Sequence, residues 1–91
     1  MSEKEKILKK LDVRWRRYHD KFNDAKSEKS EDLWLSRRMA THYLRDMFHD
    51  LLCDNYSKGK CEDILRHQLA TGLASDTPIA HGMVYVLDDI L

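Results

Sequence analysis

Four side chains that can bind a metal ion follow one another along one stretch of the sequence. They are His42, Asp46, His49 and Cys53, separated by four, three and four residues. In an α-helix this spacing places all four on one side, and imidazole, carboxylate and thiolate are usual ligands of zinc. Cys61 follows after a short polar segment and could add a further ligand. No CxxC or HExxH motif is present, so the favoured interpretation is a polar surface with a His42–Asp46 hydrogen bond, and the metal site is an alternative.

A second group of residues could bind phosphate. Residues 1–26 hold nine Lys and Arg against five Asp and Glu, whereas residues 27–91 hold seven against eleven, so the net charge of zero conceals a basic first segment. Cations that neutralise phosphates supply most of non-specific nucleic-acid binding. The candidates are Lys9, Lys10, Arg14, Arg16 and Arg17. Trp15 and Tyr18 lie among them and could stack on bases, but both also belong to the apolar stripe of this segment, which favours a solvated helix face.

Motifs for catalysis are lacking. The sequence has no GxSxG, P-loop or Rossmann glycine pattern. Neither cysteine has the neighbours that would make a convincing nucleophile, and each of the five histidines is explained as well by a core or surface role. We therefore expect a protein that is not an enzyme and that carries no cofactor.

Four helices are expected to position these residues, at about 2–26, 31–54, 60–73 and 78–91. In the first, apolar side chains recur every three or four residues, which is typical of an amphipathic helix: Leu8, Leu11, Trp15, Tyr18, Phe22 and Ala25. The second is expected to begin after an N-cap at Ser30 and to bury Leu33, Ala40, Leu44, Met47, Phe48 and Leu51. The connection between these two helices is short, so they should form an antiparallel hairpin.

The last segment is apolar in nearly every direction of a helix. Thr77–Pro78 has the pattern of an N-cap followed by proline at the first helical position. Gly82 weakens a helix, and residues 83–87 could instead form a short β-strand. We favour the helix. The predicted fold class is thus all-α: a long antiparallel helical hairpin plus two shorter C-terminal helices, in a single compact four-helix domain over residues 1–91.

Composition sets the remaining limits. A chain of 91 residues with 42% apolar and 35% charged residues has the balance of a globular domain, not of a disordered one. Two cysteines do not make a disulfide framework. The first residues are too highly charged for a signal peptide, and no apolar run reaches the roughly 18–20 residues of a membrane span. We expect a cytoplasmic protein that does not enter the membrane.

The last helix is apolar in nearly every direction, and the chain lacks catalytic motifs. These two features favour an interaction module, which acts as an adaptor, regulator or inhibitor by binding another protein. We expect a homodimer formed through the C-terminal segment. The candidate interface residues are Ile79, Met83, Val84, Tyr85, Leu87, Ile90 and Leu91. The alternatives are a nucleic-acid-binding regulator that uses the basic first helix, and a metal-binding helical protein.

Overall fold

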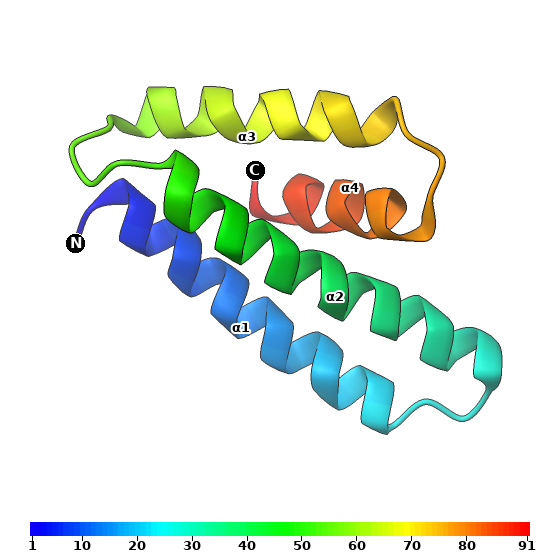
Figure 1. Cartoon of the computed structure of the whole chain (residues 1–91). Helices are drawn as coiled ribbons and strands as arrows, with labels where there is room; N and C mark the ends of the chain where they lie inside the picture. The colour runs from blue at the N-terminus through cyan, green and yellow to red at the C-terminus, as the bar shows by residue number, and fades with distance from the viewer.

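A computed structural model describes all 91 residues and contains four helices and no strand (Figure 1). They are α1 (Glu3–Asn23), α2 (Glu28–Leu51), α3 (Lys58–Leu73) and α4 (Pro78–Ile90). The predicted all-α fold is confirmed, and residues 83–87 lie within α4, so the strand alternative is wrong. None of the four helices combines the length and the apolar character needed to cross a membrane.

Each helix begins at a hydroxyl side chain that accepts a hydrogen bond from the backbone N–H three residues later. These caps are Ser2, Ser27, Ser57 and Thr77. Such a bond satisfies one of the N–H groups that the first turn leaves without a partner. The start at Thr77–Pro78 is confirmed, whereas the predicted cap at Ser30 is wrong. Ser27 caps α2, and the N–H of Ser30 donates to Ser27 Oγ at 3.2 Å.

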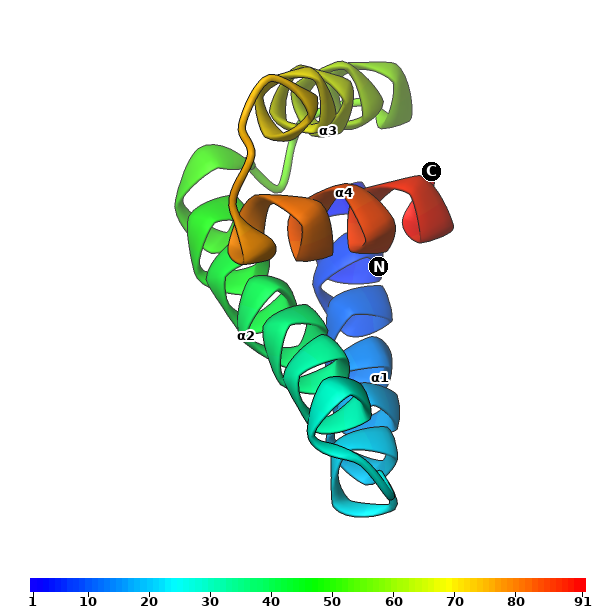
Figure 2. The same ribbon diagram turned by 90° about the vertical axis from the view of Figure 1, so that its right-hand side faces the viewer.

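The helices form three layers. The helices α1 and α2 run antiparallel beside each other as the predicted hairpin, α4 packs on α2, and α3 packs on α4. Figure 2 shows α4 lying between α3 and the α1–α2 pair. The backbone of α3 comes close to α4 and, less extensively, to α1, but not to α2.

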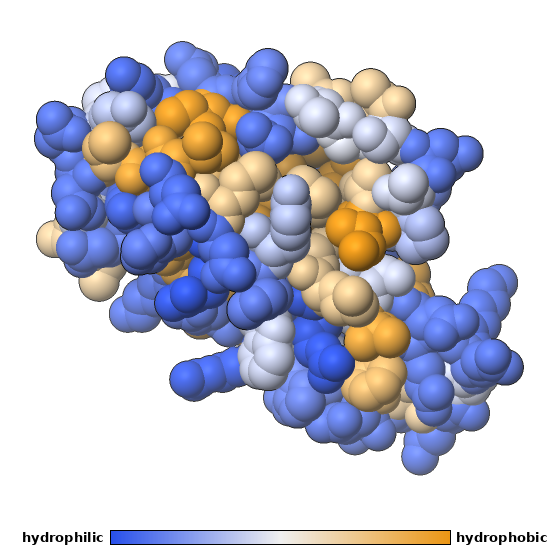
Figure 3. Space-filling model, in the orientation of Figure 1, coloured by the Kyte–Doolittle hydropathy of each residue, from blue (hydrophilic) through white to orange (hydrophobic).

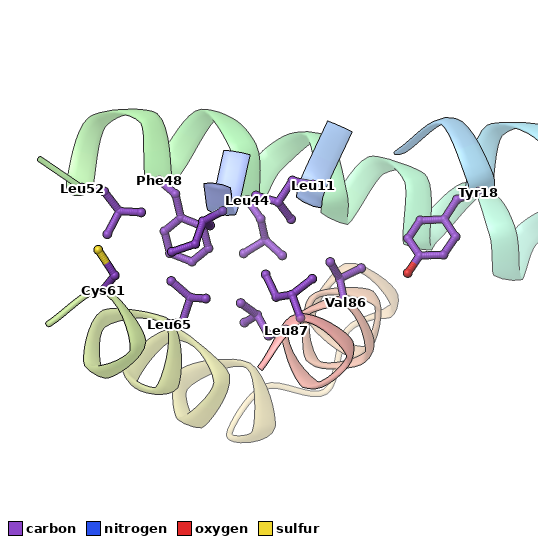
Figure 4. Close-up of a cluster of buried hydrophobic side chains, with 11 residues drawn as sticks. Leu11, Tyr18, Leu44, Phe48, Leu52, Cys61, Leu65, Val86 and Leu87 are labelled. Atoms are coloured by element: carbon purple, nitrogen blue, oxygen red, sulfur yellow. The ribbon is translucent and has the colours of Figure 1, made fainter. Parts of the chain in front are cut away.

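The core lies where all four helices meet (Figure 4). Its fully buried members are Leu11, Leu44, Phe48, Leu52, Cys61, Leu65, Val86 and Leu87. Tyr18 lies apart from them, farther along α1, as Figure 4 also shows. Two residues that we expected on the buried face of α2 are not buried, because Leu33 and Leu51 are both exposed.

Candidate functional site

Five apolar side chains form a ridge along the outer side of α2. The ridge consists of Leu35, Met39, Tyr43, Met47 and Leu51, which we call the α2 ridge. Residues four apart make one of the natural ridges of a helix, the kind that packs into the grooves of another helix. The exposed fractions are 48% for Met39, 57% for Tyr43 and 44% for Leu51. Leu35 and Met47 are half-buried, and Met47 packs against the edge of the core, so the exposed part of the ridge is Met39, Tyr43 and Leu51.

Three open hollows lie along the ridge, and neighbouring hollows share lining residues. The first, about 570 Å³, lies between Trp15, Met39, Tyr43 and Ile79. Tyr43 and Ile79 also line the second, about 290 Å³, and Gln68 is shared by the second and the third, about 780 Å³. The first hollow lies between α2, Trp15 of α1 and the start of α4, and only the other two have α3 residues in their lining. We call the three hollows together the α2–α3 groove. Figure 3 shows apolar side chains as a broken band between α3 and α2 that continues along α2.

The outer edge of the groove on α2 is acidic. Asp46 and Asp50 flank the ridge, and both are exposed. Their neighbours are histidines: His42 Nε2 lies 3.4 Å from Asp46 Oδ2, and His49 Nδ1 lies 3.5 Å from Asp50 Oδ1. From residue 46 to the end of α2 there is no Lys or Arg. On the opposite wall, Asp63 of α3 lines the third hollow.

Two cationic side chains, Arg38 and Lys60, line the ends of the groove, and each contacts a histidine or aromatic ring of this chain. Arg38 Nη1 lies 2.7 Å from His19 Nδ1, and its guanidinium stands 4.9 Å from the centre of the Phe22 ring. At the other end, Lys60 Nζ stands 4.1 Å above the ring of Tyr56. Such cation–π contacts favour the orientation in which the charge faces the ring. Both side chains keep their positive charge, so the lining of the three hollows holds two cations, Arg38 and Lys60, and two carboxylates, Asp46 and Asp63.

The structure does not assemble the metal site that was the alternative interpretation of these residues. Of the four candidates, only His42 and Asp46 come together, and no three His, Cys, Asp or Glu side chains are grouped as a metal ion would require. His49 pairs with Asp50 instead, and Cys53 is exposed near the end of α2. Cys61 faces the core with 1% of its surface exposed, so it cannot extend the set.

The predicted interface residues of α4 are divided between core and surface. Leu87 and Ile90 are 0% and 8% exposed and belong to the core, so a partner cannot reach them in this conformation. Met83 and Val84 are half-buried. The remaining three are exposed: Ile79, Tyr85 and Leu91. A helix that is apolar in nearly every direction is thus explained mainly by burial between α2 and α3.

Two of these exposed residues lie in different settings. Ile79 lines the first two hollows beside the α2 ridge. The Tyr85 ring lies 3.6 Å from the Arg37 guanidinium, which also stands 4.8 Å from the ring of Trp34. Tyr85 is therefore part of an internal cation–π cluster. Ile79 and the half-buried Met83, which lines the second hollow, connect the predicted α4 interface with the groove.

The candidate phosphate-binding residues lie on α1 in two rows. Lys10 and Arg17 are seven residues apart, as are Lys9 and Arg16, and seven residues bring a helix back to nearly the same direction. These four are exposed and form no salt bridge within the chain. Arg14 differs, because its Nε lies 2.5 Å from Asp89 Oδ2.

The two aromatic residues among these cations are not free platforms. Tyr18 is buried, and Trp15 stacks on His19 with 5.1 Å between ring centres. The interpretation that both belong to the inward stripe agrees with these positions. The basic face of α1 thus offers charge without aromatic stacking.

The α2 ridge was not predicted, although the sequence contains a signal for it. Apolar residues recur every four positions from Leu35 to Leu51. Because Met47 and Leu51 also fit the stripe predicted to be buried, this interval of four was not recognised as a separate surface. Comparison of the chain with protein-family models, with curated protein sequences and with solved structures finds no match.

Proposed function

We propose that this chain is a non-enzymatic protein-interaction module that binds another protein through the α2 ridge and the α2–α3 groove. The observation that carries the proposal is the exposure of Met39 and Tyr43 in the middle of a helix whose opposite side forms the core. A ridge from residue 35 to residue 51 is about 24 Å long at 1.5 Å per residue. That length suits an interface with one secondary-structure element of a partner.

The residue types of the ridge support this proposal. Methionine adapts its shape to irregular contacts and is common on binding surfaces, while tyrosine is enriched in protein interfaces because it combines a large apolar ring with a hydroxyl group. The ridge is continued by Ile79 of α4 and is bordered by polar residues. An apolar patch with a polar border is the usual form of an interaction site.

The proposal is tested by capture of proteins from a native lysate, treated with nuclease, on the immobilised chain. Tyr43→Glu introduces a charge in the middle of the ridge, and Val13→Glu makes the same change at an exposed apolar position of α1. We expect a protein that is retained by the wild type and by Val13→Glu but lost with Tyr43→Glu. Circular dichroism verifies that both variants are folded. Identical sets of captured proteins for all three chains would contradict the proposal.

A second candidate function is nucleic-acid binding by the basic face of α1. It is favoured by the four exposed cations that have no salt-bridge partner: Lys9, Lys10, Arg16 and Arg17. Binding of a fluorescent duplex should weaken as salt rises, with a slope of about −0.9 per phosphate contacted. The quadruple alanine variant should lose this binding and Tyr43→Glu should retain it, whereas no binding by the wild type at low salt eliminates the candidate.

A further inference from the structure

We propose that His19 is a pH-sensitive latch on Arg38, and that protonation of the imidazole releases the guanidinium into the first hollow beside the α2 ridge. The effect of this release on binding rests on the proposed function, because it concerns the same surface. The release itself does not depend on that function. Its grounds are the hydrogen bond between the two side chains, the tautomer that this bond requires and the lack of a carboxylate beside them.

The guanidinium of Arg38 is held against α1 by one hydrogen bond and by aromatic rings. Its Nη1 donates to His19 Nδ1 at 2.7 Å, and its central carbon lies 4.9 Å from the centre of the Phe22 ring and 6.0 Å from that of Trp15. The His19 ring stacks on Trp15 with an angle of 7° between the ring planes. All four residues are half-buried. His19 is therefore the hydrogen-bond acceptor that holds Arg38 in this position.

This hydrogen bond requires a neutral imidazole. Arginine has five N–H donors and no acceptor, so His19 Nδ1 must accept with its lone pair. The one proton of the neutral ring then lies on Nε2, which is 3.3 Å from the side-chain amide of Asn23, and that amide accepts the proton when its oxygen faces the ring. A second proton, taken from the solvent at Nδ1, would set N–H against N–H and one positive charge against another. Protonation therefore breaks the bond and repels the guanidinium.

No carboxylate compensates for the second positive charge. None of the salt bridges in the chain includes His19 or Arg38. Within α1 the ring contacts Trp15 and Asn23, α2 contributes Arg38, and no group of α3 or α4 forms a hydrogen bond with it. Asp20 is adjacent in sequence, but it is exposed and points about 100° away around the helix.

The response of His19 to acid is opposite to that of the other paired histidines. Three histidines lie within 3.5 Å of a carboxylate oxygen, and protonation strengthens such contacts: they are His42 with Asp46, His49 with Asp50, and His81 with Asp76. The partner of His19 is a cation instead. Because histidine changes its charge between pH 5 and pH 8, mild acid opens this contact while it tightens the other three.

A released Arg38 changes the first hollow. Arg38 lines this hollow beside four apolar side chains and one histidine–aspartate pair: Trp15, Met39, Tyr43, Ile79, His42 and Asp46. While His19 accepts its hydrogen bond, an apolar partner can cover the guanidinium without leaving that N–H unpaired. After release, the same cover removes an unpaired charged group from water, which is unfavourable. We therefore expect a partner to bind the ridge more weakly in acid.

Nuclear magnetic resonance tests the latch itself. The Nε–Hε signal of Arg38, assigned by its loss in Arg38→Met, is followed from pH 8 to pH 5 together with the ring protons of His19. We expect the Arg38 signal to shift with the midpoint of the His19 ring. It should not shift in His19→Gln, because a glutamine oxygen accepts a hydrogen bond at every pH. His81→Gln, at an exposed histidine outside the groove, should behave as the wild type. A different midpoint, or the same shift in His19→Gln, would overturn the inference.

Capture of a partner tests the regulation. The lysate experiment is repeated at pH 7.5 and pH 5.5 for a protein whose capture depends on Tyr43, and circular dichroism at both pH values verifies that each variant is folded. We expect about ten-fold weaker retention by the wild type in acid, and little change for His19→Gln or Arg38→Met. Because His42 is still present in His19→Gln, an equal loss in that variant would show that another group is responsible.

The two measurements separate the failure of the inference from that of the proposed function. If the Arg38 signal follows His19 but no captured protein depends on Tyr43, the proposed function fails and the latch stands. If a protein depends on Tyr43 but the wild type retains it equally at both pH values, the regulation is overturned and the proposed function stands.

Discussion

Gly82 lies so close to the backbone of Ser36 that a β-carbon at Gly82 would stand 2.9 Å from the Ser36 carbonyl oxygen, and 3.0 Å from the β-carbon of Ala40. This is the point where α4 crosses α2. Because Ser36 belongs to the interior of a helix, its carbonyl cannot move aside. The absence of a side chain at Gly82 therefore determines how deeply α4 sits on α2, and with it the depth of the groove beside Ile79.

We expect Gly82→Ala to destabilise the fold. The added methyl group must push α4 away from α2, and such overpacking costs about 1–3 kcal/mol. Alanine favours a helix over glycine by up to about 1 kcal/mol, which offsets part of this loss. Urea denaturation followed by circular dichroism should show a net decrease in the free energy of unfolding.

The other two glycines are matched controls for this change. Gly59, near the start of α3, has no atom within 4 Å of an added β-carbon, so Gly59→Ala should leave stability unchanged or raise it by about 0.4–1 kcal/mol. At Gly72 the nearest atom is Val84 Cγ2 at 3.0 Å, and that side chain can adjust. Gly72→Ala should therefore fall between the two, and a loss at Gly59 as large as at Gly82 would contradict the steric explanation.

Leu51 and Leu52 should respond very differently to the same truncation. Leu52 has 2% of its surface exposed within the core, so Leu52→Ala removes buried methyl groups and leaves a cavity, at a cost of about 2–5 kcal/mol. Leu51 belongs to the α2 ridge, and its truncation should cost less than about 1 kcal/mol. Thermal and urea denaturation measure both. Equal losses would mean that Leu51 is covered within the folded chain.

The difference between these neighbours shows what could be predicted from the sequence. The helices and the hairpin follow from apolar periodicity and short polar breaks. The start of α4 follows from Thr77–Pro78, because threonine is a good N-cap and proline is tolerated in the first turn of a helix. The predicted start of α2 is three residues too late, because Ser27 and Ser30 are both serines followed by glutamate and either fits the pattern of an N-cap. Only the structure shows that Ser27 is the cap.

The candidate site was harder to predict for a physical reason. Apolar residues on α2 point in most directions, so periodicity could not determine which of them are covered. Their burial depends on the crossing of α4 at Ala40, which is set by Gly82, more than forty residues away in sequence. Leu51 was therefore assigned to the core, and the α2 ridge became visible only with the tertiary structure.

The two cysteines should differ in reactivity. Burial raises the pKa of the Cys61 thiol above its ordinary value, and the negative charges of Glu3 and Cys53 raise this pKa further. Because the thiolate is the reactive species, Cys61 should be protected both sterically and chemically. At pH 8 a thiol reagent should modify one cysteine per folded chain, Cys53, and two in urea. Cys53→Ser should leave no rapidly reacting thiol, and rapid reaction in that variant would contradict the burial of Cys61.

Tyr18 should make the fold sensitive to alkaline pH. Burial raises the pKa of its hydroxyl above the ordinary 10.0, and the charge of Asp89 adds to the increase, while Arg14 and Arg17 oppose it. The folded chain then keeps this proton to a higher pH than the unfolded chain does. The free energy of unfolding should therefore fall as pH rises above about 10, by about 1.4 kcal/mol for each unit of the pKa increase. Urea denaturation between pH 7 and pH 11 should show a shallower fall for Tyr18→Phe than for the wild type, with Tyr43→Phe as the control for loss of an exposed hydroxyl. An identical fall in Tyr18→Phe would show that other groups, such as the lysines, account for the whole effect.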